Sequence, residues 1–208
     1  MGIGRRAFLK FLGAAAGATA LSPGDAVQIL DCHYVNRKLG LAFRAPSGWS
    51  FANVKAMGRV MEGQINATED EIAKQVLADE PLPVVTLTRE VLGSKDQFTP
   101  GITIYLDRLT EDWDERSWAQ TDIQLTQRLC ENFELLSGVR EFELSQCEAF
   151  DNSAKALFKH ERIEPTMVRM RNVLVNHHPC FYTIRMFDSP YANDEFRYDE
   201  FLSGLKLL

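Results

Sequence analysis

Several motifs that define whole classes of protein are missing from this sequence of 208 residues. It has no glycine-rich phosphate-binding loop, no dinucleotide-binding fingerprint and no Gly-x-Ser-x-Gly turn around a serine nucleophile. Its Cys and His residues show none of the tight spacings of zinc sites. We therefore expect a protein with no cofactor and no enzymatic activity. An enzyme whose groups meet only in the folded chain stays as a third alternative.

Positive charge is also scarce. The chain holds 23 Lys and Arg residues against 29 Asp and Glu residues, and Arg5, Arg6 and Lys10 lie within the first twenty positions. Without those three, the balance is 20 against 29, a net charge of −9. Nucleic acid and anionic lipid both select clustered Lys and Arg. The average charge therefore argues against either of them as the main partner.

Long apolar runs are missing as well, and the short one at the start has its own meaning. Arg5 and Arg6 precede a run of mainly Ala, Gly and Leu that ends in Ala18-Thr19-Ala20. This run is well short of the ~20 residues that span a bilayer. A basic start, a short apolar run and a small-residue end predict a signal peptide over residues 1–20, with Leu21 as the mature start. The paired arginines indicate the twin-arginine route, so we expect a periplasmic protein with no stable membrane span.

Only four cysteines are present, Cys32, Cys130, Cys147 and Cys180. Outside the inner membrane they allow two disulfides in three pairings. A protein that folds in the reducing cytoplasm must be stable before any bridge forms, so free thiols are an equal alternative. The sequence leaves both open.

After a lead-in segment over residues 21–38, we expect one domain over residues 39–208. Thr68-Glu69-Asp70-Glu71 has the pattern of a capping box for a short helix that ends before Pro81, with Ile72, Val76 and Leu77 on its inner side. A longer helix is predicted over residues 117–136, opened by Ser117 and Gln120 and closed by Gly138. A closing helix follows Asn193 or Asp194 and carries Phe196, Phe201, Leu202 and Leu205.

Alternating apolar residues predict the strands. Leu41, Phe43 and Ala45 alternate before a turn at Pro46 and Gly48. Ranges with strand character follow at 84–91, 101–107, 141–150, 154–161, 167–175 and 181–188. Their short connections favour antiparallel pairing. The predicted fold is α+β, an antiparallel sheet of about six to seven strands with helices packed on its faces.

This pattern resembles the PsbP and DcrB group of small exported α/β/α proteins. The resemblance rests on the strand and turn from Gly40 to Trp49, and on the closing segments from Cys180 to Arg185 and from Phe201 to Lys206. It implies a PsbP-like α/β/α sandwich that binds or helps assemble a larger complex, with no catalytic residues general to the group. A role in photosynthesis is not implied.

His177-His178-Pro179-Cys180 is the densest group of candidate metal ligands. Two imidazoles and a thiol at a hairpin tip suit a soft or borderline metal if His33 or His160 lies close. Neighbouring strand residues point to opposite faces, which favours an exposed polar turn instead. His177 and His178 are the metal-site prediction of this sequence.

A binding surface is the other kind of site that the sequence indicates. Trp113, Trp118 and Tyr191 lie in or beside predicted loops, where aromatic residues anchor interfaces or cover the core. Trp49 is expected to pack under the opening turn. The acidic run over residues 111–115 lacks the pattern of a calcium loop and suits the start of a helix.

The preferred hypothesis is an exported, non-enzymatic protein of the cell envelope that binds another envelope protein or helps assemble a complex. The alternative is a periplasmic protein that binds a small ligand or a metal through the sheet face or His177 and His178.

Overall fold

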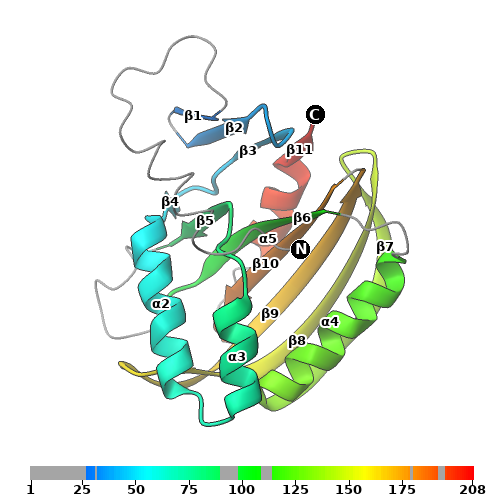
Figure 1. Ribbon diagram of the computed structural model, residues 1–208. Coiled ribbons are helices and arrows are strands. Elements are labelled where there is room, and N and C mark those ends of the chain that lie inside the picture. Colours follow the sequence, from blue (N-terminus) through cyan, green and yellow to red (C-terminus); the bar gives the residue numbers. More distant parts are fainter. Residues whose placement is uncertain (1–26, 31, 90–97, 109–113, 179, 192–194) are drawn as a thin grey trace.

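The computed structural model describes residues 27–30, 32–89, 98–108, 114–178, 180–191 and 195–208. Two antiparallel sheets and four described helices form the fold (Figure 1). In chain order the elements are β1 (Val27–Leu30), β2 (His33–Asn36), β3 (Leu41–Arg44), β4 (Ser50–Phe51), α2 (Val54–Ala67), α3 (Glu71–Asp79), β5 (Val85–Thr88), β6 (Gly101–Arg108), α4 (Glu115–Leu129), β7 (Glu131–Leu144), β8 (Cys147–His160), β9 (Ile163–His177), β10 (Cys180–Asp188), α5 (Glu195–Gly204) and β11 (Lys206–Leu207).

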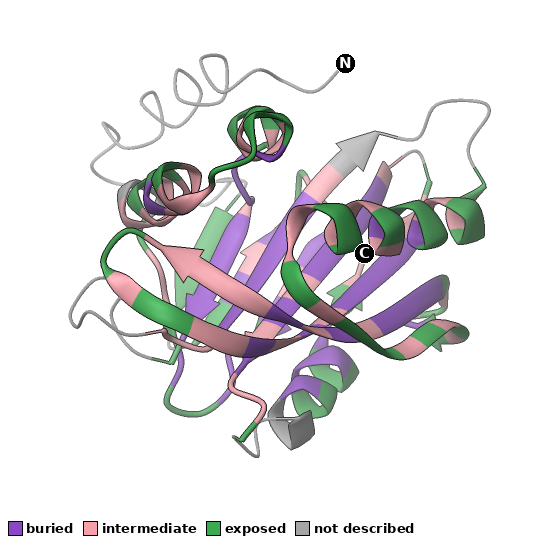
Figure 2. Cartoon of the chain, turned by 90° about the horizontal axis from the view of Figure 1, so that it is seen from below, coloured by how far each residue is buried: buried purple, intermediate pink, exposed green. Residues whose placement is uncertain are grey.

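The larger sheet has seven strands in the order β4-β5-β6-β10-β9-β8-β7. Helices α2, α3 and α4 cover one face and α5 lies on the other, so the sheet is the middle layer (Figures 1 and 2). This confirms the predicted α+β sandwich. A second sheet, β1-β2-β3-β11, was not predicted, and we call it the small sheet. No described helix is long and apolar enough to cross a bilayer.

The main apolar core lies between the seven-stranded sheet, the small sheet and α5. Ile102 and Ile104 of β6 and Ile184 of β10 are fully buried in it, together with Phe201 of α5 and Leu41 of the small sheet. The alternation that the sequence predicted for residues 101–107 is therefore present. The opposite face of β6 is buried as well, since Thr103 and Tyr105 lie under the helices.

A row of polar residues crosses the helix-covered face. Pairing in register places Thr86, Thr103, Arg185, Asn172 and Asn152 side by side on five neighbouring strands. Apolar side chains lie on both sides of this row, among them Leu174 and Phe150 on one side and Met170 and Ala154 on the other. Because buried polar groups need partners, the helices above the row must supply them.

Helix α4 and the end of α3 supply partners for Arg185 and for the Asn172 Nδ2 group, whereas the buried Asn152 Nδ2 and Asn172 Oδ1 atoms have no hydrogen-bond partner among the described residues. The Asn172 Nδ2 group donates to Asp122 Oδ2 at 2.8 Å. The guanidinium of Arg185 binds Glu80 and, at 3.4 Å, Asp122 Oδ1. Its central carbon also lies 5.2 Å from the centre of the Tyr105 ring. These contacts attach both helices to the sheet through charge and hydrogen bonds.

The predicted helix over residues 117–136 was too long. Helix α4 runs from Glu115 to Leu129, with Asp114 as its N-cap in place of Ser117 and Cys130 as an extended C-cap. The following residues form β7, so Gly138 lies within a strand. The predicted strands over 154–161, 167–175 and 181–188 correspond to parts of β8, β9 and β10, within a run of four consecutive antiparallel strands, β7 to β10. The predicted strand over 141–150 spans the turn between the first two of them.

Helices α2 and α3 also differ from the prediction. Helix α2 was not predicted at all. Helix α3 ends before Pro81 as predicted, but its N-cap is Asp70, whose side chain accepts from the Ala73 N–H at 2.7 Å. Thr68 instead donates its hydroxyl to the Gln64 carbonyl at the end of α2. Ile72, expected on the inner side, is 76% exposed.

The closing helix is α5, and the predicted caps Asn193 and Asp194 lie outside the described residues.

Candidate functional site

The outer strand of the small sheet, β1, is the most exposed apolar element in the described part of the chain. All four of its residues are exposed, and three of them, Val27, Ile29 and Leu30, are apolar. Strand β1 pairs on one side with β2 and has no described strand on its other side. Its outer edge therefore presents backbone N–H and C=O groups to a further strand.

On one face of β1, the side chains lie next to buried residues of β2 but are themselves exposed. Ile29 is in register with Tyr34 and Val27 with Asn36, and both of those β2 residues are buried. The Tyr34 ring stacks on Phe43 with centroids 5.0 Å apart. Ile29 extends this apolar face yet is 56% exposed. The described residues thus leave the underside of β1 uncovered.

The seven-stranded sheet has an edge strand, β7, with different features. Its pairing with β8 is interrupted by three register shifts, and its side chains include Glu131, Glu134 and Arg140. Bulges and charges are the usual means by which exposed edges avoid strand addition. Strand β1 has a regular register with β2 and no charged residue. This contrast makes β1 the candidate site.

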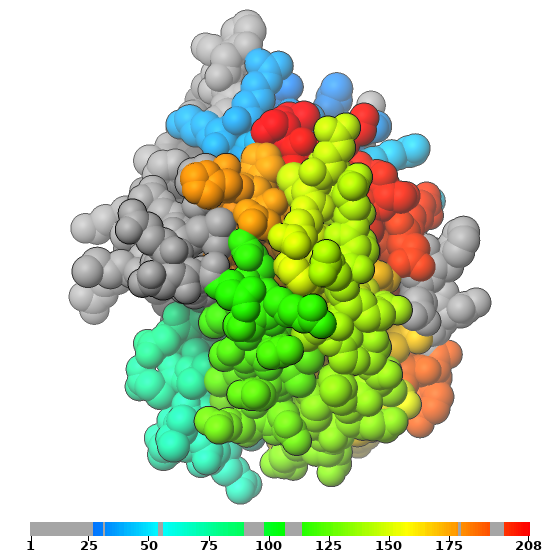
Figure 3. All heavy atoms as spheres, turned by 90° about the vertical axis from the view of Figure 1, so that its right-hand side faces the viewer, coloured from blue at the N-terminus to red at the C-terminus, as the bar shows by residue number. Residues whose placement is uncertain are grey.

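Gly40 lies just before β3, next to β11, which is the edge strand of the small sheet opposite β1. Its φ is +64°, and a Cβ there would lie 2.9 Å from the Leu208 carbonyl oxygen. The Leu208 N–H donates to the Gly40 carbonyl at 2.8 Å, next to the pairing of β11 with β3. The N-terminal and C-terminal strands therefore lie side by side at one end of the molecule (Figures 1 and 3).

The predicted metal ligands lie at the end of the β9–β10 hairpin. His177 ends β9 opposite Cys180, and its ring centre lies 6.1 Å from that of Tyr182. His178 is exposed. His160 lies at the far end of β8, where its ring packs against Gly63 of α2. Among the described residues no three His, Cys, Asp or Glu side chains are placed to hold a metal. A metal at His177 and His178 stays a prediction.

All four cysteines are free thiols in this structure, with Cys32 exposed and the others partly buried. Burial raises the pKa of Cys130, which disfavours the reactive thiolate. Cys32 follows β1 and has a φ of +68°. The structure provides no imidazole partner for a cysteine nucleophile among the contacts that it describes.

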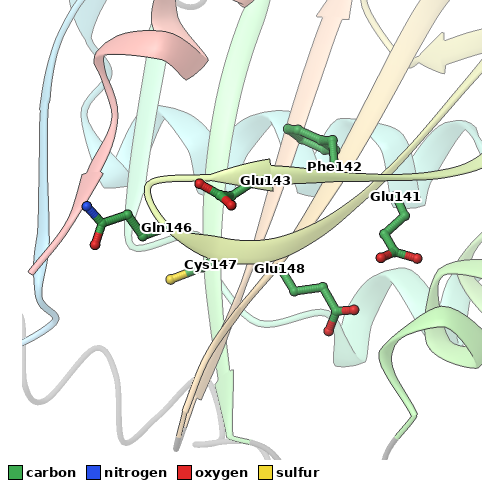
Figure 4. A pocket seen from close by; sticks show the side chains of 6 residues that line it. All are labelled: Glu141, Phe142, Glu143, Gln146, Cys147 and Glu148. Atoms are coloured by element: carbon green, nitrogen blue, oxygen red, sulfur yellow. The ribbon is translucent and has the colours of Figure 1, made fainter.

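An open pocket of about 430 Å³ lies at the turn between β7 and β8. It is lined by Glu141, Phe142, Glu143, Gln146, Cys147 and Glu148. In Figure 4 the side chains of Phe142 and Gln146 diverge from the carboxylates of Glu141 and Glu148. Burial, followed by the charge of Glu143, raises the pKa of Cys147. The titratable groups that line the pocket are the carboxylates of Glu141, Glu143 and Glu148 and the Cys147 thiol.

The aromatic residues that the sequence singled out have different environments. Trp49 is buried against Tyr198, with ring centres 6.1 Å apart, as predicted for the opening turn. Trp118 packs edge-on against Phe181 and helps cover the sheet. Tyr191 is exposed in the loop before α5. Trp113 lies outside the described residues, and Asp114 of the acidic run caps α4 as expected.

The edge of β1 was missed by the sequence reasoning because it falls within the lead-in segment. The pattern that marks it is short: an apolar run, Val27-Gln28-Ile29-Leu30, then a two-residue turn and His33-Tyr34-Val35-Asn36. Such spacing is typical of a tight hairpin.

The architecture defines an α+β protein with a PsbP-like fold. A solution structure of cyanobacterial PsbP (CyanoP) from Synechocystis sp. PCC 6803 matches 93% of this chain and 99% of its own, with 11% identity and a TM-score of 0.50. LpqN of Mycobacterium tuberculosis, described as involved in cell envelope biogenesis, matches 90% of this chain and 88% of its own, with 13% identity and a TM-score of 0.48. At these identities the likeness concerns the fold alone.

Neither a protein-family model nor a curated protein matches the sequence.

Proposed function

We propose that this chain is an exported, non-enzymatic protein of the cell envelope that binds another protein and helps assemble a complex. The partner contributes an extended segment that pairs with the outer edge of β1. The observation that carries the proposal is the exposed, uncharged and apolar edge of that strand, with Ile29 on its core-facing side. Strand addition of this kind derives affinity from backbone hydrogen bonds and specificity from alternate side chains.

The compartment follows from the start of the chain. Arg5-Arg6 and the apolar run before Leu21 support export by the twin-arginine route to the periplasm, with the folded domain crossing the membrane. CyanoP shares the fold over nearly the whole chain, which supports a scaffold of this type for the proposed role.

The proposal predicts where a partner touches the chain. A photo-crosslinking amino acid at position 29 in living cells should give a discrete adduct with one envelope protein. The same residue at position 72 is the matched control, because Ile72 is an isoleucine on α3 that is even more exposed than Ile29, 76% against 56%. Adducts at position 29 but not at position 72 support the proposal. Adducts at both positions, or at neither, contradict it.

A further inference from the structure

Charge is distributed unevenly over this acidic chain. The small sheet and its β2–β3 turn carry Arg37, Lys38, Arg44 and Lys206, and all four are exposed. Residues 27–44 contain a single acidic residue, Asp31, which lies outside the described residues. The average charge therefore conceals a basic end of the molecule. Salt screens charges beyond about 10 Å, so a molecule that approaches this end experiences its positive charge separately from the acidic remainder of the protein.

The four cations also differ from the other basic residues in their partners. None of them forms an ion pair with a described carboxylate, whereas most other described Lys and Arg side chains do. Those pairs involve Lys74, Arg140, Lys155, Lys159, Arg162, Arg169, Arg171 and Arg185. Unpaired and exposed cations on one sheet leave a positive field available to an external anion.

The register places two of these cations on the outer face of the small sheet. Arg44 of β3 is opposite His33 of β2. Lys206 of β11 is opposite Ala42, which lies two residues before Arg44 in β3. Tyr34, Leu41 and Phe43 of the alternate positions face the core. Arg44 and Lys206 therefore point away from the core, on neighbouring strands.

Two exposed leucines lie on the two sides of this cationic face. Leu30 of β1 is in register with His33 and is 73% exposed. Leu208, just after β11, is 65% exposed. Aliphatic side chains beside cations are the composition of surfaces that lie at a membrane interface, where the cations meet headgroups and the aliphatic groups enter the acyl boundary.

We infer that the outer face of the small sheet binds the anionic surface of a lipid bilayer. The four cations supply the attraction, and Leu30 and Leu208 supply the apolar contact. A bilayer is favoured over an acidic polypeptide because the two leucines are far more exposed than a purely electrostatic contact requires. The acidic body of the protein is then directed away from the membrane. This binding uses the face of the sheet and is independent of the partner strand at the edge of β1.

Vesicle co-sedimentation tests the inference on the exported chain. Vesicles of phosphatidylcholine containing phosphatidylglycerol should bind the protein, and vesicles of phosphatidylcholine alone should not. Each cation near an anionic surface contributes about fivefold in affinity, so Arg44→Gln with Lys206→Gln should weaken binding by roughly 25-fold. High salt should weaken it as well.

The matched control removes the same amount of charge elsewhere. Arg116→Gln with Arg128→Gln alters two exposed residues of α4, and vesicle binding should be unchanged. Leu30→Ser with Leu208→Ser should weaken binding to the anionic vesicles without changing the salt dependence. An Ile29→Lys variant should still bind vesicles, which separates this result from the proposed strand addition.

Three outcomes would overturn the inference. The first is an equal loss of vesicle binding in the variant at Arg44 and Lys206 and in the control variant at Arg116 and Arg128. The net charge of the protein alone would then control vesicle binding. The second is equal binding to neutral and anionic vesicles. The third is binding to soluble polyglutamate without binding to vesicles, because the face would then recognise an acidic polypeptide.

Discussion

At the residue scale, Arg185 is the side chain on which the buried polar contacts converge. It binds Glu80 and Asp122 and lies over the ring of Tyr105. These neighbours raise the pKa of Arg185 further above its ordinary value, with Glu80 as the largest favourable cause against the effect of burial. The pKa of Tyr105 is raised too, and in this case burial is the main cause. Arg185 therefore holds α3, α4 and the sheet together through its charge.

Replacement of Arg185 by Gln should lower the free energy of unfolding by about 3 kcal/mol, because Asp122 would stay buried without its cation. Urea denaturation at neutral pH measures the loss. The matched control is Arg162→Gln, whose side chain is 74% exposed and pairs with Glu161 at 3.6 Å. It should change stability by less than about 0.5 kcal/mol. Equal losses in the two variants would contradict the role given to Arg185.

Tyr182 predicts how stability depends on alkaline pH. Burial raises its pKa to about 12, and its hydroxyl donates to the Leu39 carbonyl. The folded state thus keeps this proton at pH values where an unfolded chain, titrating near 10, has lost it. The contribution of Tyr182 to the free energy of unfolding should stay constant below about pH 10 and fall between about pH 10 and 12.

Urea midpoints measured across that pH range test the alkaline dependence. Tyr182→Phe should make the fall less steep, whereas Tyr191→Phe, which alters an exposed ring, should leave it unchanged. A midpoint that rises with pH over this range would contradict the assignment.

At the element scale, the start of α3 shows different roles for Asp70 and Thr68, which the sequence placed in one capping box. Asp70→Ala removes the acceptor of the Ala73 N–H and should cost about 1 kcal/mol of stability. Thr68→Ala, which removes only a hydroxyl contact at the end of α2, should cost less than half of that. Thermal or urea unfolding of both variants gives the comparison. A larger loss of stability for Thr68→Ala than for Asp70→Ala would contradict this assignment and support the capping box that the sequence predicted.

The elements that the sequence predicted well are those with an uninterrupted period. Strand β6 alternates strictly and was placed within one residue of its end, and the hairpin of β9 and β10 was also found. The end of α4 was missed because Phe133 and Leu136 continue the helical spacing into β7. The backbone changes at Cys130 without any Gly or Pro to mark it.

Two further elements lacked the usual sequence marks. The β7–β8 turn consists of Ser145 and Gln146, both at positive φ, where Gly or Asn is the usual choice. Helix α2 has no acidic residue in its first turn and no basic residue in its last. It also contains Gly63, where a Cβ would lie 2.1 Å from the Nε2 atom of His160. The close contact that requires this glycine is a tertiary one, and no local pattern encodes it.

At the scale of the whole molecule, we propose separate roles for two surfaces: membrane binding for the cationic face of the small sheet and partner binding for the apolar edge of β1. The sequence predicted a binding protein but could not locate its surface. The exposure of Ile29 results from the absence of a described neighbour, which depends on the fold and not on local composition. Of the aromatic residues expected in that role, Trp118 packs against Phe181, Tyr191 is exposed and Trp113 lies outside the described residues.

On the proposed twin-arginine route, export of the whole molecule requires Arg5 and Arg6. Arg5→Lys with Arg6→Lys keeps the charge but removes the paired arginines of the proposed twin-arginine route. The variant should accumulate in the cytoplasm as a folded, unprocessed chain, while the unchanged sequence reaches the periplasm. Cell fractionation followed by mass measurement shows both properties. Efficient export of the variant would contradict the twin-arginine route.

The most direct test of the central proposal converts the edge of β1 into a protected one. Val27→Lys with Ile29→Lys places two charges on this strand, as natural sheet edges that resist pairing do. Native electrophoresis of gently solubilised envelopes then measures the fraction of the chain in a larger complex. We predict that this fraction falls at least tenfold, while Ile72→Lys leaves it unchanged. A complex that persists with both lysines in β1 would contradict the proposal that β1 receives the partner strand.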